Sequence, residues 1–569
     1  MSASLNPLVA LRPRPLLQAK SDRFAGALAW LSCLFLLVFL ALPLIAILGK
    51  AGQDKSGQYV GLANFAGLFD ARFGYLLHNS VGVSLATTAI VIPLAYCFAA
   101  AMMRTCMPAK PMFRMLALIP LLAPSLLPGI SLIYLFGNQG VLKAWLGDGS
   151  IYGPWGIVLG EVFYTFPHAL MILLTALSLA DARLYEAATS LGAGKVRQFF
   201  TVTLPSVRYG LISAAMLVFT LVITDFGVPK IVGGKFDVLA VEIYKQVIGQ
   251  QNFGMGSVYG LVLLFPAVLS WLVDRFVQKK QKALLTARAQ PLQPQRRAIP
   301  DIVATLFCVL VSVWLVVMLG TSVAAAFIKQ WPYNMAPTLA HFDFDNMDGG
   351  GWLAYRNSLK LALGVALLGG VAVFTGAYWV EKIRTAPVAR NVTGFLAVLP
   401  MAVPGMVLGL GYIFFFNAPG NPLNVLYGSM VLLVVCTVVH YYSTAHLTAI
   451  TALKQLDGEF EHVSASLKVP FWTTLRRVTL PICLPAVLEI ARYFFVSAMT
   501  TVSAVIFLYT PDTVLSSVAV LNMDDAGDTA AAAAMATLIV ATSAGVCLVF
   551  GLLSWSALRR TQRWRGHRD

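Results

Sequence analysis

The chain has 569 residues, of which 58% are hydrophobic and only 12% are charged, and its mean hydropathy is +0.76. This composition excludes an ordinary soluble protein and indicates a membrane protein. The formal net charge of +16 would suit a nucleic-acid-binding protein, but most of the 41 Lys and Arg residues fall in alternate loops between apolar segments. That placement is the positive-inside bias, so we predict a chain surrounded by membrane lipids, with both termini in the cytoplasm and no nucleic-acid partner.

Twelve apolar segments are long enough to cross a bilayer as helices. Their hydrophobic runs are continuous, unlike the alternating pattern of a transmembrane barrel. The predicted fold class is therefore an all-α membrane protein with about 12 transmembrane helices. The expected spans are, in chain order, approximately 24–48, 79–102, 115–137, 155–179, 209–232, 255–276, 301–327, 358–380, 393–416, 428–451, 484–509 and 530–556.

An internal repeat divides these spans into two parallel units of six. Asn79-Ser80 opens the second span, and Asn357-Ser358 opens the eighth. Because six crossings is an even number, both units enter the membrane in the same orientation and are related by an axis along the membrane normal. The predicted organisation is a cytoplasmic N-terminal tail, a first unit, a flexible cytoplasmic linker, a second unit and a basic cytoplasmic tail, at 1–23, 24–276, 277–300, 301–556 and 557–569.

Prolines interrupt the third span of each unit. Pro120-Leu-Leu-Ala-Pro124 in the first unit matches Pro400-Met-Ala-Val-Pro404 in the second. Proline removes a backbone donor and kinks a helix, which membrane proteins tolerate beside cavities or neighbouring helices. On one interpretation, the kinks simply bend the helices for packing. On the other, they form a hinge or a cavity wall along a transport path. On the second interpretation, Pro124 and Pro404 are candidate path residues.

One carboxylate lies within the predicted fifth span, where a charge at depth is costly. Asp225 either reaches the interface or pairs with Lys230, or it contacts a cationic group of a solute or controls an outer gate. Its counterpart, 276 residues later, is Thr501. Asp225 and Thr501 are therefore further candidates for the path, whereas Glu161, near the start of the fourth span, is expected at the interface.

No set of residues predicts a catalytic or metal site. The cysteines show no paired spacing, and His440 and His446 are six residues apart, so they do not share a helix face. We find no nucleophile with a base, and we expect no enzyme activity and no cofactor on this chain. The nearest Gly-Lys pair, Gly194-Lys195, is followed by Val and lacks the glycine spacing of a phosphate-binding loop, so energy from ATP must enter through another chain.

A polar, basic loop occurs before the fifth span of each unit. Residues 181–205 read DARLYEAATSLGAGKVRQFFTVTLP, and residues 457–481 read DGEFEHVSASLKVPFWTTLRRVTLP. The two copies align without a gap at an offset of 276 residues. A polar loop at the same place in two hydrophobic units predicts a docking surface on one side of the membrane.

The first copy predicts a short helix, a break at a glycine and a second segment that ends at a proline. Its pattern, E-A-A, then G, then L-P, consists of Glu186, Ala187, Ala188, Gly192, Leu204 and Pro205. The two alanines allow close approach of another surface, and Gly192 permits a turn that a side chain would hinder.

The second copy departs from this pattern. His462 stands where Glu186 stands in the first copy, Lys468 replaces Gly192, and Glu461, one position early, substitutes in part. We expect a docking helix with a different turn and unequal binding by the two loops. The residues assigned to docking in this copy are Glu461, His462, Ser466, Leu467, Leu480 and Pro481.

The repeated loop resembles the hallmark of the permease subunits of bacterial binding-protein-dependent ABC importers, and the resemblance covers nearly the whole chain. It implies that each loop is a coupling helix and that two copies of a cytoplasmic ATP-binding subunit, which uses ATP and Mg²⁺, dock there. It also implies a periplasmic or lipid-anchored solute-binding protein on the other side, and a location in the bacterial cytoplasmic (inner) membrane.

The fused two-unit layout is similar to the iron(III) and 2-aminoethylphosphonate branch of these importers. Residues 224–256 look most like 2-aminoethylphosphonate permeases, which implies that phosphonate as the solute. Ferric iron is the alternative, and polyamine or sulfate-type solutes are less favoured candidates. An ion-gradient-driven secondary transporter would share the span count but does not predict the matched loops, and a membrane-embedded enzyme lacks any visible catalytic set.

Overall fold

The computed structural model describes residues 20–178, 180–284, 292–383, 385–457, 459–467 and 469–561. In this part of the chain, 10 helices are long and apolar enough to cross a membrane, and the number rises to 12 if each of two bent helix pairs counts as one span. The predicted all-α membrane architecture is confirmed. The described strands form one small antiparallel hairpin, β1 (Ile328–Gln330) and β2 (Asn334–Pro337).

The first unit begins with two helices that a π-helical turn joins. Its helices are α1 (Lys20–Leu36), α2 (Leu42–Ala51), α3 (Ala71–Arg104), α4 (Lys110–Leu118), α5 (Leu126–Phe136), α6 (Pro154–Ser178), α7 (Ala182–Ser190), α8 (Lys195–Gln198), α9 (Leu204–Thr224), α10 (Gly227–Val232), α11 (Leu239–Tyr244) and α12 (Phe253–Leu284). The last of these extends into the segment 277–300 that was expected to be a flexible linker, of which 285–291 lie outside the described residues.

The second unit repeats this order. Its helices are α13 (Ala298–Phe327), α14 (Gly351–Gly364), α15 (Gly370–Glu381), α16 (Pro387–Leu396), α17 (Gly405–Phe416), α18 (Met430–Lys454), α19 (Glu459–Ser466), α20 (Phe471–Thr474), α21 (Leu480–Thr500), α22 (Ser516–Ala526) and α23 (Thr529–Thr561).

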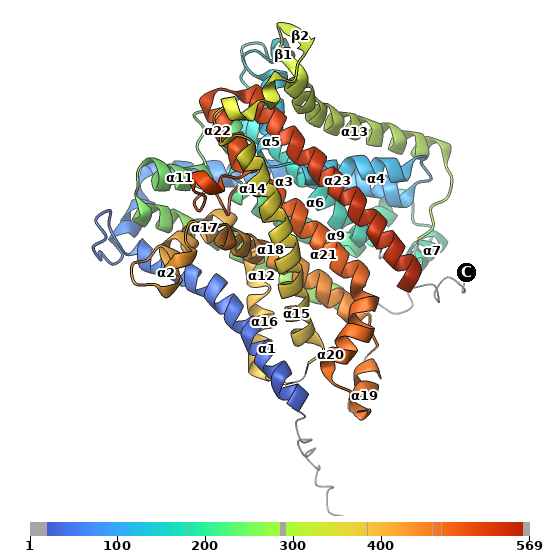
Figure 1. The fold of residues 1–569 in the computed structure, drawn as a ribbon. Helices are drawn as coiled ribbons and strands as arrows, with labels where there is room; N and C mark the ends of the chain where they lie inside the picture. Colours follow the sequence, from blue (N-terminus) through green and yellow to red (C-terminus); the bar gives the residue numbers. More distant parts are fainter. Residues whose placement is uncertain are drawn as a thin grey trace, which may run out of the picture.

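The first helices of the two units cross over to the other unit (Figure 1). α1 and α2 pack against α16 and α17, whereas α13 packs against α4 and α5. Two hydrogen bonds accompany these crossings: the Tyr412 hydroxyl donates to the Phe39 carbonyl at 2.6 Å, and Trp331 Nε1 donates to the Tyr134 carbonyl at 2.9 Å. Each unit is therefore completed by a helix from the other.

The third span of each unit is broken, not merely kinked. The first-unit pair, Lys110–Leu122 and Leu126–Phe136, bends by 102°, and the second-unit pair, Pro387–Ala402 and Gly405–Phe416, bends by 117°. Pro124 and Pro404 lie at these breaks. Each proline lacks the backbone donor that a continuous helix would need there, so the helix restarts in a new direction.

The predicted outer boundaries of the fifth and eleventh spans are wrong. Span 209–232 was expected to be one helix, but α9 ends at Thr224 and the chain continues into the short helices α10 and α11. Span 484–509 likewise ends early, since α21 stops at Thr500. The residues beyond these ends are apolar because protein covers them, and hydropathy does not distinguish burial in protein from burial in lipid.

The repeated Asn-Ser pair holds these non-helical segments in place. Asn79 Nδ2 donates to the Asp237 carbonyl at 2.9 Å, and Ser80 Oγ accepts from the Leu239 backbone N–H at 2.8 Å. In the second unit, Asn357 Nδ2 donates to the carbonyls at 512 and 514, and Ser358 Oγ accepts from the N–H at 516. Because buried backbone groups need partners, this pair makes the segment after the fifth span possible in both units.

A charged cluster reinforces the same segment in the first unit. Arg72 donates to Asp237 at 2.7 Å and to Glu242 at 2.8 Å, and Lys245 donates to Asp237. Burial raises the pKa of Asp237, but the hydrogen bonds from Lys245 and Arg72 outweigh it and leave this pKa below its ordinary value. Asp237 is therefore ionised and paired at neutral pH.

Candidate functional site

The first polar loop forms an exposed helix, α7. The Asp181 side chain caps its start by accepting from the Arg183 backbone N–H at 3.1 Å. Glu186 and Ala187 are exposed and Ala188 is half-buried, so the E-A-A residues lie at the accessible surface. This surface is available to a partner.

A tight turn follows α7. Gly192 has φ of +74°, a left-handed conformation that strains other residues, and its backbone N–H donates to the Thr189 carbonyl at 2.9 Å. The Ala193 N–H then donates to the Ala188 carbonyl at 2.9 Å. Gln198 Nε2 donates to Thr189 Oγ1 and to the Ala193 carbonyl, which joins α8 to α7.

The second polar loop closes in the same way. After α19 the Val469 N–H donates to the Ser464 carbonyl at 2.9 Å, and these two positions are the counterparts of Ala193 and Ala188. For this main-chain hydrogen bond, the prediction of a different turn in the second loop is therefore wrong. Ser466 and Leu467 are exposed, with Leu467 70% accessible. The His462 side chain, together with the whole of residue 468, lies outside the described residues.

Each loop is anchored to the C-terminal end of its unit's second span by a cation. Arg104, the last residue of α3, lies over the Tyr185 ring at 4.8 Å. Lys382, next to the end of α15, pairs with Glu461 at 3.1 Å. Tyr185 and Glu461 are equivalent positions at the offset of 276, so Glu461 faces inward to an anchor rather than outward like Glu186. Sequence reasoning missed both cations, although a basic residue at the end of each second span was a visible signal.

The end of each loop also repeats in detail. A π-helical turn covers Phe199–Thr203 in the first copy and Leu475–Thr479 in the second, again 276 residues apart. Such turns are rare and often mark functional segments. The Leu-Pro pairs follow these turns directly, at the first residues of α9 and α21 and within the continuous helical spans Lys195–Thr224 and Phe471–Thr500. These residues are Leu204 and Pro205 in α9, and Leu480 and Pro481 in α21.

The structure brings the four candidate path residues together in two equivalent pairs. In the first unit the break at Pro124 lies against the end of α9, because a Cβ at Gly227 would collide with Ser125 Oγ. In the second unit the break at Pro404 lies against the segment after Thr501, because a Cβ at Gly405 would collide with the Ser503 side chain. In both units a broken third span therefore meets the end of the next-but-one span.

Asp225 does not pair with Lys230. Its carboxylate accepts from the Val228 backbone N–H at 2.8 Å, whereas Lys230 Nζ pairs with Asp525 of the second unit at 2.9 Å. Thr501 directly follows α21 and is buried. Glu161, predicted near the membrane interface, lies on α6 with its side chain fully buried in the protein.

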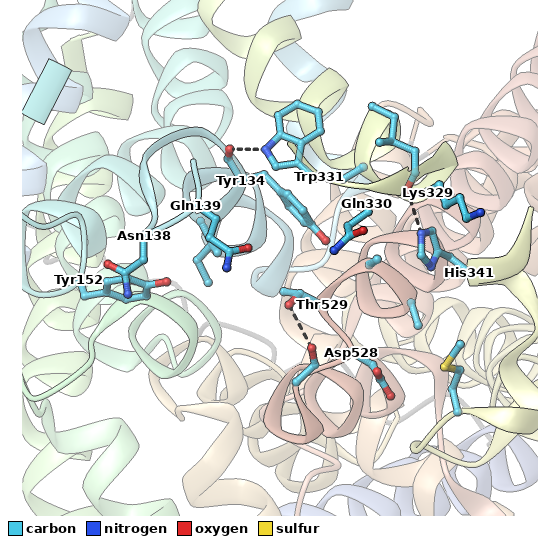
Figure 2. Close-up of a pocket in the computed structure, with 17 residues that line it drawn as sticks. Tyr134, Asn138, Gln139, Tyr152, Lys329, Gln330, Trp331, His341, Asp528 and Thr529 are labelled. Carbon is cyan, nitrogen blue, oxygen red and sulfur yellow. Dashed lines mark hydrogen bonds between the residues drawn. The ribbon is translucent and has the colours of Figure 1, made fainter. Parts of the chain in front are cut away.

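A cavity of about 500 Å³ opens between the units near the β1–β2 hairpin. Figure 2 shows that one wall comes from the first unit and the other from the second. Trp331 crosses between them by donating to the Tyr134 carbonyl, and a ring nitrogen of His341 contacts the Ile328 carbonyl at 2.9 Å. The polar side chains that line this cavity are Tyr134, Asn138, Gln139, Tyr152, Lys329, Gln330, His341, Asp528 and Thr529.

The His, Cys, Asp and Glu side chains of the described spans do not gather in larger groups. In the described ranges, no group of three or more His, Cys, Asp or Glu side chains is arranged to hold a metal ion. His440 packs on Tyr441 with ring centroids 4.5 Å apart, and His446 stacks on Tyr442 at 5.7 Å. Both histidines therefore pack on tyrosine rings rather than on each other.

Comparison with known families gives a match in each unit. Residues 97–282 and 371–561 match the family described as the binding-protein-dependent transport system inner membrane component. The two matched segments contain α7 and α19 respectively, so each includes one polar loop.

Similar individual proteins include two ferric transport system permeases. The one from Haemophilus influenzae is 27% identical over 419 residues and the one from Actinobacillus pleuropneumoniae is 26% identical over 451 residues, or 70% and 77% of this chain. The chain covers 65% of the length of each. A spermidine/putrescine transport system permease homologue from Mycoplasma pneumoniae is 24% identical over 44% of this chain and 91% of its own length.

Proposed function

Because this chain belongs to the family of binding-protein-dependent transport system inner membrane components, we propose that it forms the whole transmembrane pathway of an ATP-driven solute importer. The observation that carries this proposal is the pair of exposed helices α7 and α19, which occupy equivalent places in two parallel units. One chain would thus supply both docking surfaces that a pair of ATP-binding subunits requires.

Transport would follow from the separation of the two loops. ATP-bound and nucleotide-free ATPase subunits hold α7 and α19 at different distances, and a ligand shifts a conformational equilibrium only through such differential contacts. The anchors Arg104–Tyr185 and Lys382–Glu461 would pass this displacement to α3 and α15. A solute-binding protein would deliver the solute at the opposite side, and both termini would lie in the cytoplasm with the basic loops.

For the solute we propose ferric iron. The two ferric permeases match over most of the chain, whereas the polyamine relative matches less than half of it. The 2-aminoethylphosphonate interpretation, drawn from residues 224–256, gains no support from these relatives. It remains the competing outcome of the experiment below.

The test is uptake of radiolabelled ferric iron and of radiolabelled 2-aminoethylphosphonate by cells with and without the gene. We expect iron uptake that requires the gene and that stops when ATP is depleted while the proton gradient is maintained. Loss of phosphonate uptake alone would keep the importer and overturn iron as its solute. Uptake that survives ATP depletion but collapses with the proton gradient would instead show a secondary transporter and overturn the role of the loops.

A further inference from the structure

A fully buried carboxyl group in the first unit has no donor. Glu161 lies in α6 with no exposed surface, and neither of its carboxylate oxygens accepts a hydrogen bond from any described residue. A buried acid without a partner is costly in protein and in lipid. Such a group needs a proton or a cation to neutralise it.

The polar group beside Glu161 is a second carboxyl, that of Asp225. The two acids interact directly, and Ser125 at the break of the third span also lies next to Asp225. Asp225 accepts a backbone hydrogen bond from Val228 at 2.8 Å, and the Gly227 backbone and the Ser125 hydroxyl also interact with its carboxylate. Two carboxylates in contact repel each other unless a proton or a cation lies between them.

A phenol of the first unit lies near this acid pair, and two phenols of the second unit lie near that phenol. Tyr164 is three residues after Glu161 on α6 and lies within electrostatic reach of both acids and of Tyr441 and Tyr493 in the second unit. The Tyr441 and Tyr493 rings meet edge to face, with centroids 6.0 Å apart. Tyr164 and Asp225 are half-buried, whereas Glu161 is fully buried, so the acids and phenols form a cluster that reaches the accessible surface only in part.

The acid pair is not a requirement of the fold. At the offset of 276, Glu161 corresponds to Thr437 and Asp225 corresponds to Thr501. Thr437 is equally buried, but its hydroxyl donates to the Leu433 carbonyl at 2.8 Å and is satisfied within its own helix. The same architecture thus exists in the second unit without any carboxylate, so packing alone does not explain the acids of the first.

We propose that Glu161 and Asp225, with the hydroxyl of Tyr164, form a transient oxygen-ligand site for a hard, highly charged cation on its way through the membrane. The identity of that cation as ferric iron rests on the function proposed above. Carboxylate and phenol oxygens are the ligands that hard cations prefer. Two carboxyl groups, rather than a full coordination shell, hold an ion weakly enough to release it, which conduction requires.

The direct test uses the purified full-length chain in detergent with Tb³⁺ as the probe, because nearby tyrosines sensitise Tb³⁺ luminescence. We expect saturable emission from the wild type that Ga³⁺ competes away. Glu161→Gln and Asp225→Asn are each expected to weaken Tb³⁺ binding about 10- to 100-fold. Asp348→Asn, which neutralises an exposed aspartate in the loop after β2, is the matched control and should bind like the wild type.

A second variant and a second readout separate this site from the proposed solute. Glu161→Thr copies the residue that the second unit folds with, so it is expected to keep the wild-type unfolding temperature while losing Tb³⁺ binding. Wild-type Tb³⁺ affinity in all three acid variants would overturn the site. If the wild type imports no labelled iron but the variants still lose Tb³⁺ binding, iron is not the solute and the cation site stands. If the variants import iron at the wild-type rate, the cation site is overturned and the importer function stands.

Discussion

At the scale of single residues, the most informative pair is the repeated Asn-Ser within α3 and α14. These side chains bind backbone groups of the segment that follows the fifth span, and they do so in both units. A polar pair inside a predicted span therefore has a structural purpose, since it replaces the hydrogen bonds that a broken helix loses.

Asn79→Ala tests this purpose. The substitution leaves the buried carbonyl of Asp237 without its donor, which costs about 1–3 kcal/mol and is expected to lower the unfolding temperature by several degrees. Thermal unfolding of the detergent-solubilised protein measures the effect. Asn138→Ala, an exposed position, is the control and should leave the temperature unchanged. Equal unfolding temperatures for the two variants would show that the Asn79 hydrogen bond stabilises nothing.

At the scale of elements, the two polar loops share their backbone but differ in the side chains they present. Both close with the same main-chain hydrogen bond and both continue into a π-helical turn. In the first loop a glutamate points outward, whereas in the second the glutamate one position earlier pairs with Lys382. The backbone that the two loops share predicts that both bind ATPase subunits. Their different exposed side chains predict that they bind these subunits with different affinity.

Glu186→Lys and Leu467→Asp are the variants that separate the two loops. Each reverses or adds charge on an exposed residue, so neither should disturb folding. We expect both to reduce the amount of ATPase subunit retained in a pull-down, by clearly different factors. Arg208→Ala, an exposed residue beyond the first loop, is the control. Identical losses from the two loops would contradict the asymmetry, and full retention by both would contradict docking at these loops.

At the scale of the whole molecule, the seam between the units is built from crossing helices and from a few charged contacts. The first helix of each unit packs on the other unit, and Lys230 of α10 pairs with Asp525 of α22 across the seam. Asp524 is the adjacent residue. Burial, together with the charge of Asp525, raises its pKa to about 6, against an ordinary value of 3.8, despite the opposing effect of Lys230.

The raised pKa of Asp524 predicts a pH dependence of stability. The folded chain binds a proton at Asp524 near pH 6 and the unfolded chain only near pH 4, so this residue's contribution favours folding at acid pH and is lost as the pH rises through 6. Asp524→Asn is therefore expected to raise the unfolding temperature by a few degrees at pH 7. It should also reduce the increase in unfolding temperature that the wild type shows when the pH falls from 7 to 5.

Thermal unfolding of the two proteins at pH 7, 6 and 5 measures this effect. The control is Asp528→Asn, an exposed aspartate just beyond α22, which should follow the wild-type pH profile. If the unfolding temperature of Asp524→Asn rises between pH 7 and pH 5 as much as that of the wild type, Asp524 does not titrate between these pH values.

The sequence by itself determined the all-α membrane class, the two parallel units, the repeated loops and the family to which they belong. Apolar runs of bilayer length and a gapless repeat at 276 residues are local patterns, and they need no knowledge of contacts. The positions of Pro124 and Pro404 likewise indicated an interruption of each third span before the bends were seen.

Only the tertiary structure decided how these elements meet. Hydropathy extended the fifth and eleventh spans too far, because residues after Thr224 and Thr500 are covered by protein rather than by lipid. The exchange of first helices, the anchors at Arg104 and Lys382, and the burial of Glu161 beside Asp225 all join residues that are distant in the chain. Packing between spans decides which residues become partners. The sequence pattern of a single span does not predict which other span will pack against it.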